Sequence, residues 1–363
     1  MTSLLNELRH DPALWLLVFV PAVFVGHELW PEEHTLLFAL SVLGIVPLAA
    51  LLSRATESVA ARTGDTVGGL LNATLGNLTE LVIALTALRA GQYLLVKASL
   101  AGAIVTNTLF MLGASFLLGG LTYHVQDFNR LNARLQASLL FLATVALLMP
   151  SVAKVTDAPQ ADFAQGLSLG LSGLLIVAYA LGLVFSLKTH RELFAAAEHA
   201  GDDAAPWPIA VALTALAVAT VLVALVSEVF VESVQQAADS LGMTPAFVGF
   251  IVVALVGGAA EMVSAFSGAR KNRLDLSVGI ALGSAAQIAL FVAPVLVLLS
   301  YFVGPTPMDL RFWPGAIAMM LIATLTAALV TSGGRSAWFV GLLLLMVYFT
   351  FAMTLYLLPP PAQ

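Results

Sequence analysis

Apolar runs of about 20 residues recur along the whole chain, and short polar stretches separate them. A run of this length can cross a bilayer as an α-helix, whereas a membrane β-strand needs only about ten residues of alternating polarity. The runs here are long and do not alternate. We therefore predict an all-α polytopic membrane protein with about eleven transmembrane helices, at 13–29, 35–62, 65–89, 95–121, 132–151, 164–188, 207–239, 244–268, 275–302, 311–331 and 336–358.

Composition agrees with a chain embedded in lipid throughout. Of its 363 residues, 60% are hydrophobic and only 10% are charged, which does not suit a water-facing surface. The absence of cysteine excludes disulfides, thiolate metal sites and thiol nucleophiles, so any chemistry must come from carboxylates, amides and hydroxyls. We expect membrane lipid as a partner and no nucleic acid, and the sequence leaves the oligomeric state open.

The distribution of basic residues predicts the orientation. Eleven Lys and Arg residues fall at the amino terminus or near the loops after even-numbered spans, and four fall on the opposite side, namely Arg89, Lys97, Lys154 and Arg311. The larger group is Arg9, Arg54, Arg62, Arg130, Arg134, Lys188, Arg191, Arg270, Lys271, Arg273 and Arg335. Because basic loops stay in the cytoplasm, we expect a cytoplasmic amino terminus and, after eleven spans, an outside carboxyl terminus.

An internal repeat divides the chain into two halves. A shift of 181 residues aligns Gly76 with Gly257, Glu80 with Glu261 and Gly102 with Gly283. We predict an amino-terminal segment with the first span at 1–34, a five-helix repeat at 35–188, a short acidic cytoplasmic linker at 189–206 and a second five-helix repeat at 207–363. Five is odd, so the second repeat must enter the membrane from the opposite side, an inverted topology typical of secondary transporters.

Five glutamates lie within the predicted spans, namely Glu57, Glu80, Glu228, Glu232 and Glu261. A charged side chain at the bilayer centre costs about 2.5–3.5 kcal/mol on insertion scales, so such residues usually serve a function. A protonated acid held between helices, or one that reaches the interface, is the alternative. For Glu57, near a span end, that alternative is as well supported as a functional role.

Each of Glu80 and Glu261 follows a glycine by four residues and so lies one helical turn from it on the same face. If the helices open at Gly76 and Gly257, freed carbonyl oxygens point toward the carboxylates. Carbonyl, carboxylate and carboxamide oxygens form a site that suits calcium. One divalent cation or two protons would neutralise the pair, so the site can hold either load but not both.

Other chemistries find little support in the sequence. It contains no His-Glu-x-x-His motif, no Gly-x-Ser-x-Gly elbow and no Walker loop. All six histidines fall in predicted loops or at span ends, where a solvated polar role is sufficient. A membrane hydrolase or a purely structural protein would also leave the duplicated acids unexplained.

Two long motifs carry a resemblance to a known family. The stretches GGLLNATLGNLTELVIALTALRAGQ, residues 68–92, and GGAAEMVSAFSGARKNRLDLSVGIALGSAAQIALF, residues 257–291, resemble the two signature repeats of the calcium/proton antiporter (CAX) family. That family belongs to the wider cation/calcium exchanger superfamily. The resemblance extends over essentially the whole chain after the first span.

The resemblance implies roles for particular residues. Glu80 and Glu261 match the acidic pair that binds calcium or protons, Asn77 and the backbone near Gly76 and Gly257 assist it, and Asn107 and Gln287 match carboxamides that border the same site. Glu57, Glu228 and Glu232 match acids associated with proton coupling and ion access. The second signature usually reads Gly-Asn-Ala-Ala-Glu-His, and Gly258 and Met262 depart from it.

The resulting expectation is an antiporter that exchanges Ca²⁺ for H⁺ by alternating access, with no enzymatic activity and no cofactor. A Na⁺/Ca²⁺ exchanger or another divalent cation exchanger of the same superfamily is the alternative. The short linker resembles that of compact prokaryotic members, so we expect the inner (plasma) membrane of a prokaryotic cell.

Overall fold

The computed structural model describes residues 12–152, 160–190 and 206–357, and almost all of them are helical. The first part of the chain forms α2 (Pro12–Trp15), η1 (Leu16–Val18), α3 (Phe19–Leu29), α4 (His34–Thr63), α5 (Asp65–Leu75), α6 (Leu78–Arg89), α7 (Tyr93–Val105), η2 (Thr106–Met111), α8 (Leu112–Tyr123), α9 (Arg130–Val152), α10 (Gln160–Val184) and η3 (Phe185–Thr189). The short strand β1 (Val125–Asp127) lies between α8 and α9.

The second part repeats the order of the long helices from α4 to α10. It forms α12 (Ile209–Ser240), α13 (Pro245–Phe247), η5 (Val248–Val253), α14 (Ala254–Gly257), α15 (Ala259–Arg270), α16 (Leu274–Gln287), η6 (Ile288–Val292), α17 (Ala293–Val303), α18 (Pro314–Thr331) and α19 (Trp338–Leu357). Strand β2 (Arg335–Ala337) pairs antiparallel with β1 and was not predicted. The all-α membrane architecture is confirmed.

The exact number of spans stays a prediction. Within the described residues, 8 helices are long and apolar enough to cross a membrane, or up to 10 if each of two bent pairs is one span. The first predicted span corresponds to a shorter apolar helix, Leu16–Leu29. Its length falls below that of an ordinary membrane-crossing helix, so eleven crossings are not established.

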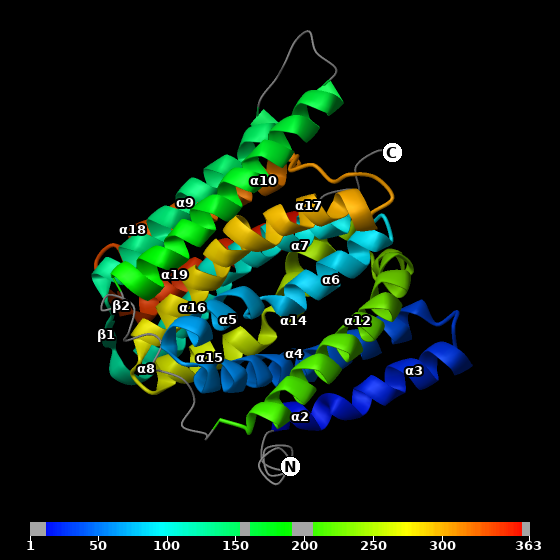
Figure 1. Ribbon diagram of the computed structural model, residues 1–363, viewed down its shortest axis with the longest axis horizontal. Coiled ribbons are helices and arrows are strands. Elements are labelled where there is room, and N and C mark those ends of the chain that lie inside the picture. The colour runs from blue at the N-terminus through cyan, green and yellow to red at the C-terminus, as the bar shows by residue number, and fades with distance from the viewer. Residues whose placement is uncertain (1–11, 153–159, 191–205, 358–363) are drawn as a thin grey trace.

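The repeat seen in the sequence recurs in the helix boundaries. A shift of 181 residues carries α6 onto α15 residue for residue, and it carries the first residue of α7 onto the first residue of α16. The carboxyl end of α4 meets the amino end of α12, because Arg62 Nη2 donates to the Pro206 carbonyl at 2.9 Å. These equivalent helices therefore run antiparallel, as inverted halves require (Figure 1).

One end of the molecule, which we call the β end, carries β1 and β2 and the loops after α8, α15 and α18. Gln126 Nε2 joins these loops by donating to the Ala269 carbonyl and to Asn272 Oδ1, both at 2.9 Å. Most of the predicted cytoplasmic bases that the structure describes are at this end, including Arg130, Arg134, Arg270, Lys271 and Arg335.

The opposite end, which we call the Asp309 end, is held by the loop between α17 and α18. The Tyr93 hydroxyl donates to the Thr306 carbonyl at 2.6 Å and accepts from the Thr306 amide at 2.8 Å. The carboxylate of Asp309 forms an ion pair with Lys97 of α7 and another with Arg311. Only 17% of the Lys97 side chain and 13% of that of Asp309 are exposed, so this pair ties the two halves together in a largely dry setting.

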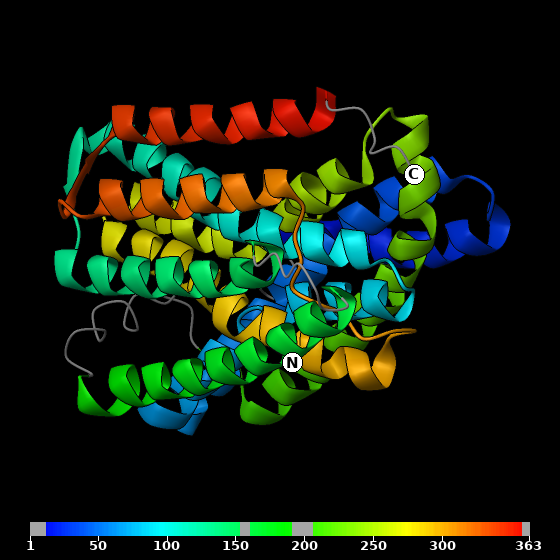
Figure 2. The ribbon, with the colours of Figure 1, turned by 90° about the horizontal axis from the view of Figure 1, so that it is seen from above.

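The core is centred on α7 and its continuation. Every residue from Ala98 to Leu109 is buried, and Figure 2 shows the cyan helix crossing the middle of the bundle. Helices α10 and α19 leave much more of their surface exposed, as expected for outer helices. Helix α12 is as exposed as α10 over its most apolar stretch.

Candidate cation site

Two helix breaks meet at the centre of the molecule. Helices α5 and α6 bend by 41° at the break formed by Gly76 and Asn77, and α14 and α15 bend by 60° at Gly258. Asn77 (φ −99°, ψ 29°) and Gly258 (φ −81°, ψ 7°) leave helical geometry. The last carbonyls of α5 and α14 therefore lose the amide partners of a continuous helix. Both breaks lie where the sequence predicted them, within one residue.

The two central glutamates occupy equivalent places just after the breaks. Glu80 is in the first turn of α6, and Glu261 is in the first turn of α15. Helix amino termini carry unpaired amides and a partial positive charge, which favour a carboxylate. Both side chains are partly buried, and Glu261 Oε2 has no hydrogen-bond partner among the described residues.

The two half-sites contact each other across the repeat. A Cβ atom added to Gly257 would lie 3.0 Å from Cγ and 3.5 Å from Oε1 of Glu80. A Cβ atom added to Gly76 would lie 3.6 Å from Oε1 of Gln287. The two glycines therefore let a side chain of one half approach the backbone of the other half. A larger residue at position 257 would intrude on the Glu80 carboxylate.

A chain of hydrogen bonds fixes the carboxamides around this contact. Asn107 Nδ2 donates to Ser284 Oγ at 2.9 Å, and Ser284 Oγ donates to Asn77 Oδ1 at 2.8 Å. Asn77 Nδ2 in turn donates to Gln287 Oε1 at 2.6 Å. The network joins the α5–α6 break and η2 of the first half to α16 of the second.

Ser284 was not predicted as a site residue. Its side chain is 4% exposed and lies next to Glu261 as well as between the two asparagines. The spacing carries a signal that could have pointed to it, since Ser284 precedes Gln287 by three residues and so shares its helix face.

Gly258 and Met262, the two residues that depart from the signature, lie together at the second helix break. The repeat aligns Gly258 with Asn77, so the second break lacks the carboxamide that anchors the first. A Cβ atom added to Gly258 would lie 3.4 Å from Cε of Met262 and 3.7 Å from Oδ1 of Asn107. The Met262 methyl group therefore borders the space that a side chain at position 258 would enter.

The other three predicted acids lie outside the hydrogen-bonded network. Glu57 is half-buried on α4, with Ser53 Oγ at 3.4 Å and Arg54 at 3.7 Å among its contacts. Glu228 and Glu232 are exposed on the same face of α12, and Glu228 pairs with Arg89 at 3.5 Å. The structure brings the other seven predicted site residues together and leaves these three apart from the network.

The chemistry of the central group is that of oxygen donors. It offers two carboxylates, carboxamide and hydroxyl oxygens and backbone carbonyls, and the described residues contain no cluster of three His, Cys, Asp or Glu side chains. Such a donor set suits a hard cation that tolerates irregular coordination, as Ca²⁺ does. A small pocket beside Glu80, lined by Ser99, Val253 and Ala254 among others, adjoins the group on its Asp309 side.

Comparisons with known proteins agree with this geometry. The sodium/calcium exchanger protein family matches residues 33–188 and 211–357. A protein of Aphanothece halophytica named Ca(2+)/H(+) antiporter is 40% identical over 95% of this chain and 96% of its own length. The Bacillus subtilis Ca(2+)/H(+) antiporter ChaA is also 40% identical, over 93% and 97%.

A solved structure is similar over nearly the same extent. The structure of native YfkE superposes with a TM-score of 0.82 at 38% identity and covers 95% of this chain and 99% of that one. The match covers nearly the whole length of both proteins, and it confirms the family predicted from the two motifs. The chain belongs to the sodium/calcium exchanger protein family, and its relatives within that family include the named Ca²⁺/H⁺ antiporters.

Proposed function

We propose that this protein exchanges Ca²⁺ for H⁺ across a membrane by alternating access. The observation that carries the proposal is the meeting of two glutamates at the amino ends of two half-helices, with Glu80 against the backbone of Gly257. Interrupted helices that meet across inverted repeats are the usual binding sites of secondary transporters. The named activity of the relatives supports the same assignment.

Glu80 and Glu261 alternate between calcium and protons in this proposal. Asn77, Asn107 and Gln287 supply or orient neutral oxygens, and the backbone at Gly76 and Gly257 completes the ligand set. Because one Ca²⁺ carries the charge of two protons, either load leaves the pair neutral. The site can then cross between its two access states in either form, but not when it is empty and doubly charged.

A Na⁺/Ca²⁺ exchanger remains the alternative, and the donor count argues against it. Several sodium ions would need several additional oxygen cages, and the two breaks supply one compact group of donors. The relatives of about 40% identity are named for proton exchange.

The driving ion can be tested in liposomes that contain the purified protein and a calcium reporter. With the membrane potential clamped, we expect an acid interior to drive external calcium inward. A matched sodium gradient at equal pH should leave calcium uptake at the rate of protein-free liposomes. Sodium-driven uptake that persists without a pH difference would favour the alternative.

The outer acids are expected to tune transport. Glu228→Gln, Glu232→Gln and Glu57→Gln should each shift the pH at which uptake is half-maximal, with a loss of maximal rate below about tenfold, because proton relays contribute through their titration. The measurement is uptake against pH in liposomes. If all three variants keep the wild-type profile, these acids take no part in proton access.

We further propose that the β end faces the cytoplasm in a prokaryotic plasma membrane, with the carboxyl terminus outside. The support is the collection of Arg and Lys side chains at that end. Reporter proteins fused to the two termini would test the orientation. If both reporters were found on the same side of the membrane, the proposed orientation would be contradicted.

A further inference from the structure

Between the candidate site and the Asp309 end, α7 and η5 touch through a contact that only glycine permits. A Cβ atom added to Gly102 of α7 would lie 2.1 Å from the carbonyl oxygen of Phe250 in η5. A Cβ atom added to Gly249 would lie 2.5 Å from Cβ of Ala98. The backbones of a helix from each half therefore touch directly, and the residues on both sides of this contact are buried.

The 181-residue shift identifies the equivalent contact on the other side of the site. It relates Gly102 to Gly283 of α16, and it relates Phe250 to Gly69 of α5. The same backbone approach could therefore form between α16 and α5, toward the β end. Glycine at both positions would permit a contact at least as close as the one observed.

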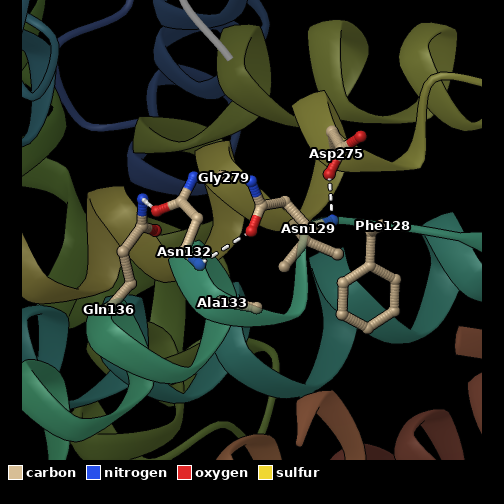
Figure 3. Close-up of a pocket in the computed structure, with 8 residues that line it drawn as sticks. Phe128, Asn129, Asn132, Ala133, Gln136, Asp275 and Gly279 are labelled. Carbon is tan, nitrogen blue, oxygen red and sulfur yellow. Dashed lines mark hydrogen bonds between the residues drawn. The ribbon is translucent and has the colours of Figure 1, made fainter. Parts of the chain in front are cut away.

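In the present structure Gly283 is not packed in this way. The only described atom within 4 Å of a Cβ atom added there is Oε1 of Gln136, at 3.6 Å. Gln136 is held by Asn132, and Figure 3 shows both side chains on α9 beside α16. The face of α16 that leads from Leu276 through Gly283 to Gln287 is half-exposed, whereas the equivalent stretch of α7 is buried.

Helix α5 packs elsewhere. A Cβ atom added to Gly68 would lie 2.3 Å from the carbonyl oxygen of Ala60, so α5 lies against α4. Its residues Val67 and Leu70 are 51% and 43% exposed. The two sides of the site thus differ in packing although their sequences are related by the repeat.

We propose that Gly69 and Gly283 form the second gate of the transporter. In the opposite access state α5 leaves α4 and packs on α16 with Gly69 against Gly283, while α7 and η5 separate at Gly102 and Phe250. The inference rests on the proposed antiport, which needs two access states. Its specific content is the pair of backbones that closes the β end.

Two substitutions should shift the protein in opposite directions. A Cβ atom at position 283 has space in the present state. The side chain of Gly283→Leu would block the approach of α5, so this variant should hold the β end open and stop exchange. Gly102→Leu would collide with Phe250 and should favour the opposite state. Gly166→Leu is the matched control, because a Cβ atom added to Gly166 of α10 meets no described atom within 4 Å.

The readout is thiol labelling, and the chain contains no cysteine that could interfere. Ser264→Cys places a thiol on α15, three residues after Glu261, at a half-exposed position on the β side of the site. With a membrane-impermeant reagent added from the β end, we expect Gly102→Leu to lower the labelling rate on the order of tenfold. Gly283→Leu should keep or raise the rate, and Gly166→Leu should leave it unchanged.

Labelling requires no ion transport. The labelling experiment can therefore reject the gate while the proposed antiport is still supported, and a failed transport experiment would not by itself reject the gate. Equal labelling of the Gly102→Leu and Gly283→Leu proteins would overturn the proposal.

Should Gly102→Leu fail to fold, Gly69→Cys combined with Gly283→Cys provides a second measurement. Oxidation should cross-link this pair and stop exchange until the disulfide is reduced, since a disulfide needs Cα atoms within about 7 Å. Absence of the cross-link in both calcium-loaded and acidic conditions would equally reject the gate.

Discussion

Replacement of either central glutamate should abolish exchange without unfolding the protein. In Glu80→Gln or Glu261→Gln the amide keeps one ligand oxygen, but it carries no charge and cannot take up a proton. Loss of one charged ligand weakens cation binding by about 3 kcal/mol, roughly a hundredfold in affinity. Because the same group must also carry protons, we expect calcium uptake under a pH gradient to fall to the rate of protein-free liposomes.

A neutral substitution elsewhere separates this effect from a general loss of charge. Glu32 is exposed in the loop before α4, so Glu32→Gln should transport at the wild-type rate. Size-exclusion profiles and thermal unfolding in detergent would show that all variants fold alike. Near-normal uptake by a correctly folded Glu80→Gln or Glu261→Gln protein would refute the assignment of the pair.

The second large effect concerns stability at the Asp309 end. Asp309→Asn would leave the Lys97 ammonium largely buried without its counter-charge, and removal of one partner of a buried pair costs about 3 kcal/mol or more. We expect a clear fall in the thermal midpoint of the purified protein. Lys97→Met combined with Asp309→Asn should recover most of the loss, because it removes both charges together.

An exposed ion pair provides the control for this prediction. Arg335 and Asp127 pair at 2.6 Å on β2 and β1, but 74% and 71% of their side chains are exposed. Exposed pairs contribute little, so Asp127→Asn should change stability by less than about 1 kcal/mol. If Asp309→Asn were no more destabilising than Asp127→Asn, the loop at the Asp309 end would not be held by its ion pair.

The same pair sets a pH dependence with a definite sign. Burial alone would raise the pKa of Asp309, but the hydrogen bond and charge of Lys97, helped by Arg311, hold that pKa below its usual value of 3.8. The ionised carboxylate therefore stabilises the fold fully above the usual value. That stabilisation is lost as the pH falls through the lowered pKa, so the difference between wild type and Asp309→Asn should shrink in strong acid.

Much of the architecture could be predicted because it depends on local sequence. Long apolar runs specify membrane helices whatever their neighbours are, and Gly76 and Gly257 mark the breaks because glycine weakens a helix wherever it occurs. The match between Glu80 and Glu261 revealed the repeat, since charged residues are rare in such runs. These features need no knowledge of which helices touch.

Contacts between the halves could not be predicted in the same way. The role of Ser284 depends on Asn77 and Asn107 of the other half, and nothing in the local sequence of α16 fixes those partners. Lys97 was assigned only to a side of the membrane, because its partner Asp309 is 212 residues away. Glu228 and Glu232 are exposed on one face of α12 while neighbouring residues such as Phe230 are buried, and the sequence alone did not show which face would turn outward.

Two of the π-helical turns, η2 and η6, lie at equivalent positions in the two halves. A π turn is in effect a single residue inserted into an α-helix, and it is usually kept only where it serves a function. One such turn ends at Met111 in η2 and another ends at Val292 in η6, which are equivalent positions 181 residues apart. Two independent insertions at the same place would be a coincidence. The turn that ends at Met111 and Val292 therefore belongs to the pattern that the two halves share, whereas the π turn of η5 (Val248–Val253) falls opposite the plain α-helix of α5 and distinguishes the halves.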